Sequence, residues 1–136
     1  MPSTIIPTLR YENAPAMIDW LCETLGFQRH LVVEDGTGGI THAQLTRGDS
    51  MIMLGSVRDN AFDHLQGTPR RLGGTTQSAY VIVHDVDGIC AKARERGAEI
   101  VLEPKDESYG GRSFSCRDPE GHLWNFGSYD PWAKSH

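Results

Sequence analysis

Three things are scarce in this 136-residue chain, and each shortage narrows what the protein can be. Cysteine occurs only at Cys22, Cys90 and Cys116, far apart and without a Cys-x-x-Cys pair. Scattered cysteines, odd in number, favour a reduced, cytoplasmic setting over a disulfide-bonded secreted one. Positive charge is in the minority, because 13 Lys and Arg face 18 Asp and Glu and leave a formal net charge of −5. This acidic balance disfavours nucleic acid as a partner.

Long apolar runs are also missing. No stretch approaches the roughly 18 residues that cross a bilayer, so no membrane association is expected. The opening residues, MPSTIIPTLRY, lack a basic region followed by an apolar core, which predicts no secretory signal. The remaining composition, 38% hydrophobic and 23% charged residues, is that of an ordinary globular protein. We therefore predict a single domain over residues 1–136.

A repeated order of elements is the clearest positive signal. Residues 4–11 indicate a strand, and residues 13–26 indicate a helix with Pro15 in its first turn and Gly26 at its end. Three more strands are expected at 27–34, 40–48 and 51–55. The same order then recurs as a strand at 78–84, a helix at 85–97 and strands at 98–104, 112–117 and 122–129.

The spacing of the two sets indicates a duplication. Gly26 and Gly97 end the two helices, Ile6 and Ser78 open the two first strands, and both pairs are separated by about 71 to 72 positions. The predicted fold class is α+β, with two tandem βαβββ modules, 4–55 and 78–129, that form curled, mostly antiparallel sheets around a cleft. The Gly-rich segment 56–77 is expected to be a linker, with a lid or a dimer contact as the alternative.

Alternation along the strands assigns side chains to two faces. One face is apolar and is expected to lie under the helices: Leu9, Ala43, Leu45, Ile52, Leu54, Val81, Val83, Trp124 and Phe126. The other face mixes polar and apolar groups: Ile6, Thr8, Arg10, His42, Gln44, Met53, Ser78, Tyr80, Ile82 and Asn125. A sheet curled around this mixed face would form a ligand cleft, whereas a flat sheet would only expose it to water.

The paired modules, LRYENAPAMIDWLCETLGF near the start and RDPEGHLWNF near the end, resemble the vicinal oxygen chelate superfamily. Glyoxalase I, the fosfomycin resistance proteins, extradiol dioxygenases and the bleomycin resistance proteins are members. The Asp-Pro-x-Gly turn followed by a strand is the most specific part of the resemblance. The resemblance to this superfamily implies a homodimer. It also implies a divalent metal held by His, Gln or Glu from the first and last strand of each module. The matching positions in this chain are Ile6, Met53, Ser78 and Asn125.

Those four side chains are poor ligands for a hard or borderline divalent ion. Isoleucine has no lone pair, serine and asparagine are weak neutral donors, and methionine suits soft ions. We therefore expect no metal and no other cofactor. A register error of one residue would instead bring in Glu12, His84 or His122 as ligands.

The predicted function is the binding of a small organic molecule, such as a drug or a toxic metabolite, in the sheet cleft. The residues expected to contact it are Thr8, His42, Gln44, Met53, Ser78, Tyr80, Arg112 and Asn125. Whether the protein is an enzyme stays open, and no catalytic or metal-binding residue is assigned. The alternatives are a metal-dependent lyase, isomerase or dioxygenase with a non-standard site, metal-free acid–base chemistry by His42, or an assembly domain. His42 could equally be a neutral histidine that is hydrogen-bonded to a neighbouring strand side chain.

Overall fold

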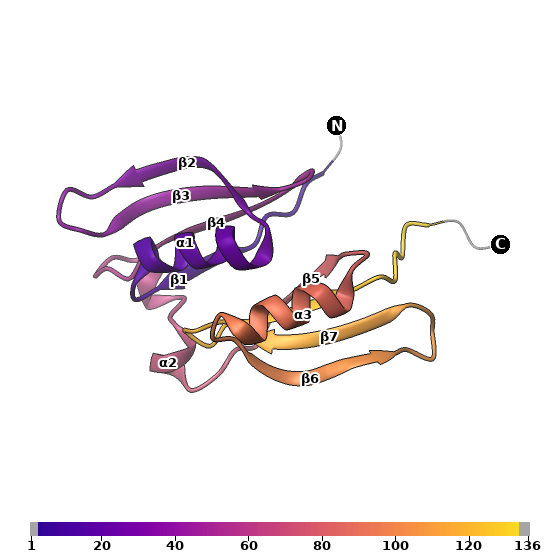
Figure 1. The fold of residues 1–136 in the computed structure, drawn as a ribbon. Helices are drawn as coiled ribbons and strands as arrows, with labels where there is room; N and C mark the ends of the chain where they lie inside the picture. Colours follow the sequence, from indigo (N-terminus) through magenta and orange to yellow (C-terminus); the bar gives the residue numbers. More distant parts are fainter. Residues whose placement is uncertain (1–2, 134–136) are drawn as a thin grey trace. The chain divides into compact units, whose positions relative to one another are not determined.

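The computed structural model describes residues 3–133, so the predicted limits at 1 and 136 lie outside the described residues. The chain divides after Gly74 into two compact units, and each contains one four-stranded sheet and one long helix (Figure 1). Both units repeat the order strand, helix, strand, strand, strand. The α+β class and the tandem βαβββ modules are therefore confirmed, with sheets that are open rather than closed barrels.

In the first unit the order along the sheet is β1-β4-β3-β2. Strand β1 pairs in parallel with β4, and the other two pairings are antiparallel. Two short helical turns, η1 and α2, follow the last strand. The bounds are β1 Thr8–Tyr11, α1 Ala14–Leu25, β2 Gln28–Glu34, β3 Ile40–Arg47, β4 Ser50–Ser56, η1 Phe62–His64 and α2 Pro69–Leu72.

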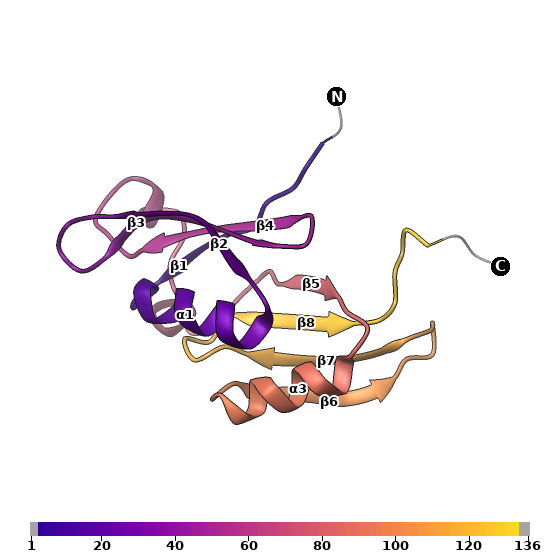
Figure 2. The ribbon, with the colours of Figure 1, turned by 45° about the horizontal axis from the view of Figure 1, so that its top comes forward.

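The second unit has the same topology in the order β5-β8-β7-β6, which Figure 2 shows from another side. Strand β5 runs parallel to β8, and the remaining neighbours are antiparallel. The bounds are β5 Ala79–Ile82, α3 Val86–Glu95, β6 Glu99–Asp106, β7 Arg112–Arg117 and β8 Leu123–Gly127. Within residues 3–133, none of the helices has the length and apolar character that crossing a membrane requires.

Both long helices start and stop where local chemistry demands. The Asn13 side chain accepts a hydrogen bond from the Ala16 amide at 3.3 Å, Pro15 lies in the first turn, and Gly26 ends α1 with φ of 83°. In α3 the Asp85 side chain accepts from the Gly88 amide at 3.0 Å. The predicted helix positions are therefore confirmed.

Each helix covers one face of its own sheet. Helix α1 packs on β1, β2 and β4, and α3 packs on β6 and β7. Most of the residues predicted under the helices are buried, namely Ala43, Leu45, Ile52, Leu54, Val83, Trp124 and Phe126. Leu9 and Val81 are only half-buried, because β1 and β5 are edge strands with a neighbour on one side.

The first strand is shorter than the predicted 4–11. Pro7 has no N–H to donate, so the ladder to β4 begins with Thr8, although the Pro7 carbonyl still accepts from the Met53 amide at 3.0 Å. The segment 56–77, which is predicted to be a linker, has some regular structure of its own. It contains η1 and α2, and it belongs almost entirely to the first unit.

The turn Asp118–Gly121 joins β7 to β8 and is held by one buried carboxylate. Asp118 accepts from the backbone N–H groups of Glu120 and His122 and from the indole N–H of Trp124, at 3.0 to 3.1 Å. Gly121 takes φ of 95°, which favours glycine, and its N–H donates to the Asp118 carbonyl at 2.8 Å. This carboxylate therefore serves the turn and the packing of Trp124.

Candidate functional site

The helix-free face of the first sheet gathers four of the predicted ligand residues. The register places Thr8 beside Met53 and Met53 beside Gln44, and His42 follows two residues away on the same face. The amide nitrogen of Gln44 lies 3.1 Å from Nε2 of His42. The atom that would act as a base is thus already in contact with a neighbouring side chain.

Residues 57–74, which we call the strap, reach this face from the end of β4. The Gln66 side chain bonds twice to Thr8: its amide nitrogen donates to the Thr8 carbonyl at 2.7 Å, and its oxygen accepts from the Thr8 hydroxyl at 3.3 Å. Thr8 lacks backbone ladder partners on its outer side, because β1 is an edge strand. The Gln66 side chain therefore takes up the hydrogen-bonding groups of Thr8 at the outer edge of β1.

A shielded ion pair anchors the strap to β1. Arg10 Nε donates to Asp63 Oδ1 at 2.8 Å, with side-chain exposures of 16% and 8%, and the guanidinium lies 4.7 Å from the Phe62 ring centroid. The second oxygen of Asp63 accepts from the Arg58 amide at 2.7 Å. Burial alone raises the pKa of Asp63, but the hydrogen bonds from Arg58 and Arg10 and the nearby positive charge outweigh it. The net effect holds the pKa below its ordinary value.

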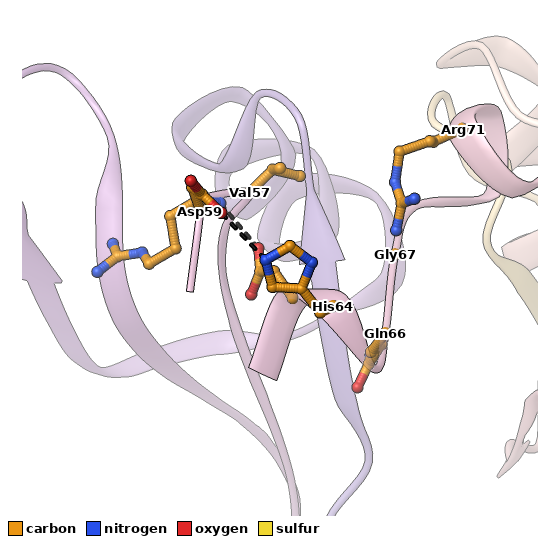
Figure 3. A pocket seen from close by; sticks show the side chains of 8 residues that line it. Val57, Asp59, His64, Gln66, Gly67 and Arg71 are labelled. Carbon is orange, nitrogen blue, oxygen red and sulfur yellow. Dashed lines mark hydrogen bonds and ion pairs between the residues drawn. The ribbon is translucent and has the colours of Figure 1, made fainter. Parts of the chain in front are cut away.

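A cavity of about 220 Å³ lies along the strap (Figure 3). Its walls carry polar side chains that already have partners, since His64 contacts Asp59 at 3.1 Å and Asp63 contacts Arg10. None of the predicted ligand residues lines it. The lining residues are Val57, Arg58, Asp59, Asp63, His64, Gln66, Gly67 and Arg71.

The helix-free face of the second sheet centres on Asn125. The register sets Asn125 between Tyr80 of β5 and Ser115 of β7. Its oxygen accepts from the Ser115 hydroxyl at 2.7 Å. Its nitrogen donates to the Ser78 hydroxyl at 2.8 Å and to the Ala79 carbonyl at 3.1 Å. Three side chains from three segments therefore form one hydrogen-bonded group.

Tyr80 adds an aromatic surface next to that group. Its hydroxyl donates to the Tyr129 carbonyl at 2.7 Å, and its ring lies over Gly127, where an added Cβ would sit 2.9 Å from Tyr80 Cε1. Tyr129 in turn meets Tyr109 edge to face, with ring centroids 5.2 Å apart. Partial burial, followed by the neighbouring Tyr109, raises the pKa of Tyr80. About 41% of Tyr80 stays exposed, which leaves area for contact with a ligand.

Arg112 is not brought together with these residues. Its guanidinium forms two bonds to the Asp87 carboxylate of α3, at 2.9 and 3.0 Å, and a third to Asp106 at 3.3 Å. Alternation in β7 places Arg112 on the same face as the buried Phe114 and Cys116, under α3. No local sequence signal pairs positions 87 and 112, so only the fold reveals this contact.

The positions that would hold a metal can be tested one unit at a time. In the first unit Ile6 precedes β1 and offers no donor atom, while Met53 offers a soft thioether. In the second unit the Asn125 nitrogen, which cannot bind a metal, faces Ser78, and its oxygen faces Ser115. Within residues 3–133, no group of three or more His, Cys, Asp or Glu side chains is arranged to hold a metal ion. These donor sets do not fit a hard or borderline divalent ion.

Two open sheets of identical topology, each with one helix-covered and one mixed face, define a duplicated βαβββ protein of the vicinal oxygen chelate type. Residues 6–126 match the model of the Glyoxalase/Bleomycin resistance protein/Dioxygenase superfamily, and the chain belongs to that family.

Relatives and solved structures agree with this assignment. The chain is 29% identical over 121 residues to the uncharacterized protein Rv0887c of Mycobacterium tuberculosis, covering 89% of this chain and 71% of the relative. It is similar to TioX of Micromonospora sp. ML1, with 31% identity, a TM-score of 0.73, and coverage of 93% and 98% of the two chains.

A more distant match shows the shared fold alone. A mutant of the fosfomycin resistance protein FosX of Listeria monocytogenes, solved with Mn(II) and 1S,2S-dihydroxypropylphosphonic acid, has 15% identity and a TM-score of 0.70. The match covers 96% of this chain and 94% of that one.

Proposed function

We propose that this protein binds a small organic molecule without the help of a metal, against the helix-free faces of its sheets. The observation that carries the proposal is the hydrogen bonding of the Asn125 and Ser78 side chains. Their polar atoms bond to each other, to Ser115 and to Ala79, where a metal-dependent relative would present ligands. A hydrogen-bonded group of this kind suits an organic ligand better than a cation.

The surfaces around these groups combine apolar contact with a few polar atoms. In the first unit the proposed contacts are Thr8, His42, Gln44 and Met53, beside the exposed apolar residues Leu31 and Val33. In the second unit they are Ser78, Tyr80 and Asn125, beside the exposed Ile82. Arg112 is left out, because its bonds to Asp87 tie it to the helix-covered face.

Metal content tests the metal-free part of the proposal. The protein is purified without a metal-affinity tag and analysed for zinc, nickel, iron and manganese. We expect far less than one equivalent of each. One equivalent of any of them would reject the proposal and favour the alternative enzyme with a non-standard site.

Binding tests the ligand surface. A panel of small aromatic compounds is screened by thermal shift, and compounds that raise the melting temperature are measured again on variants. Tyr80→Ala and His42→Ala are expected to weaken binding, whereas Arg112→Ala, with its side chain on the opposite face, serves as the matched control. Unchanged binding in both of the first two variants would show that the proposed faces are wrong.

A cytoplasmic homodimer completes the proposal. The family resemblance supports the dimer, and the free thiols of Cys22, Cys90 and Cys116 suit a reducing compartment. Analytical ultracentrifugation should give twice the chain mass of 15.1 kDa. Sedimentation at the single-chain mass over the micromolar range would contradict the dimer.

A further inference from the structure

The geometry points to a hydrogen-bond relay in the second unit, Ser115 to Asn125 to Ser78, that leaves the proton of the Ser78 hydroxyl available to donate to a ligand oxygen. The inference rests on the proposed function, because it assumes that a ligand meets this sheet face. It goes further by naming the chemical group that the face selects. Ser115 and Asn125 orient the Ser78 hydroxyl in this scheme, and Ser78 donates the hydrogen bond to the ligand.

The orientation of the Asn125 amide is fixed by the Ala79 carbonyl, which can accept a hydrogen bond but cannot donate one. The Ala79 carbonyl only accepts, and it lies 3.1 Å from the Asn125 nitrogen. A flipped amide would place two acceptor oxygens against each other and would also face the Ser115 hydroxyl with a nitrogen. The nitrogen therefore points toward Ser78 and Ala79, and the oxygen points toward Ser115.

This orientation dictates where each hydroxyl proton goes. The Asn125 oxygen receives the Ser115 proton at 2.7 Å. One amide hydrogen serves Ala79 and the other serves the Ser78 oxygen at 2.8 Å. Ser78 thus accepts through its oxygen, and its own proton must point elsewhere. Among residues 3–133, no side chain or carbonyl accepts that proton, so it is available to a ligand.

The two ends of the relay differ in burial, so its hydrogen bonds run from the buried Ser115 toward the exposed Ser78. Ser115 is 7% exposed, so little water competes for its proton, whereas Ser78 is exposed and faces whatever lies on the sheet. Tyr80 is two residues along β5 on the same face and pairs in register with Asn125. A planar molecule that stacks on Tyr80 can therefore bring an acceptor to Ser78. The ligand class that follows is an aromatic molecule carrying a carbonyl oxygen.

A matched pair of probes tests the inference on the full chain. 2-Acetylnaphthalene and 2-isopropenylnaphthalene are both planar, and they differ mainly in C=O against C=CH2. Each is titrated into 15N-labelled protein while backbone amide shifts are followed. We expect shifts at Ser78, Tyr80 and Asn125 with both probes, and about five- to tenfold tighter binding of the ketone, as one added hydrogen bond allows.

Variants assign the preference to the relay. Ser78→Ala should bring the ketone to the affinity of the alkene. Asn125→Asp should do the same while keeping the Ser78 hydroxyl, because a carboxylate accepts from both serines and draws the Ser78 proton inward. Ser113→Ala is the control, since Ser113 lies on the same face of β7 but bonds to Glu107. It should retain the full preference. Urea unfolding of each variant confirms that the fold persists.

The outcomes separate the two proposals. Equal affinity of both probes for the natural protein, with shifts on this face, would reject the relay and leave the ligand surface intact. A ketone preference that survives Ser78→Ala would also reject it. Absence of shifts with either probe would reject the ligand surface and the relay together. Nuclear Overhauser contacts from the Asn125 side-chain amide to Ser78 and Ala79 check the amide orientation without any ligand, and their absence would overturn the relay.

Discussion

Arg10 and Asp63 form an ion pair across 53 positions of the chain, with 2.8 Å between Nε and Oδ1. The pair ties the first strand to the strap, which would otherwise be a polar, Gly-rich connection. Its two side chains are largely shielded from solvent, in contrast to the exposed pair of His64 and Asp59. The strap is therefore part of the first unit.

Asp63→Asn should destabilise the protein by about 2 kcal/mol, since it removes the carboxylate charge beside the shielded guanidinium of Arg10. Asp59→Asn is the matched control in the same segment, and we expect a change below about 0.5 kcal/mol because its pair is exposed. Urea unfolding at pH 7 measures both. Equal effects would show that the Arg10–Asp63 pair contributes no more than a surface pair.

The effect of Asp63 should depend on pH in a defined direction. Its pKa is lower in the folded protein than in the unfolded chain, so its contribution is fully present above the unfolded value, near 3.9. That contribution is lost as the pH falls through the folded value. The difference in unfolding free energy between the natural protein and Asp63→Asn should therefore shrink in acid. A difference that stays constant from pH 7 to pH 3 would contradict this linkage.

Asp118→Ala should cost about 3 kcal/mol, because it leaves two backbone N–H groups and the Trp124 indole N–H without this acceptor in a buried turn. Pro119→Ala, next to it and exposed, should cost less than about 1 kcal/mol. Denaturant unfolding followed by Trp fluorescence measures both variants. A small effect of Asp118→Ala would mean that water replaces the carboxylate.

Cys116 should resist alkylation in the folded protein. Burial, reinforced by the nearby Asp118 carboxylate, raises the pKa of its thiol to about 12, so almost no reactive thiolate exists at pH 8. Cys22 is more exposed and should be modified first. Mass spectrometry after iodoacetamide treatment, with and without denaturant, gives the order. Modification of Cys116 ahead of Cys22 would contradict the packing of β7.

Gly127→Ala should displace the Tyr80 ring, since the new methyl group would lie within 3.0 Å of its Cζ. The bond from the Tyr80 hydroxyl to Tyr129 would then break, and the aromatic surface would be lost. Crystallography or the NMR shifts of the Tyr80 ring report the change. Gly74→Ala is a control, because an added Cβ there has nothing within 4 Å. An unmoved Tyr80 ring would show that the backbone of β8 shifts instead of the ring.

The duplicated fold could be predicted because its signals are local. Apolar periodicity, Pro15 and the two terminal glycines mark the helices, and seven of the nine residues that strand alternation placed under the helices are buried. Leu9 and Val81 are more exposed than expected because alternation gives the face of a residue but not whether its strand lies at an edge.

The side-chain contacts could not be predicted in the same way. Arg10 with Asp63, and Arg112 with Asp87, are brought together by the fold across 53 and 25 positions, and no residue pattern encodes such pairs. The contact of His42 with Gln44 spans only two positions. Alternation places both side chains on one face, so a hydrogen bond from His42 to a neighbouring strand side chain is one of the two roles predicted for it.

The two copies of the module have diverged at a position that their registers make equivalent. Thr8 pairs with Met53 in one copy, and Tyr80 pairs with Asn125 in the other. Gln66 from the strap engages Thr8 through its hydroxyl and its carbonyl, whereas Tyr80 keeps an aromatic ring exposed. Duplication has thus produced two non-identical surfaces from one ancestral pattern. The aromatic surface of Tyr80 lies within the second unit, and the bonds between Gln66 and Thr8 lie within the first, so the duplicated positions now present different chemical groups.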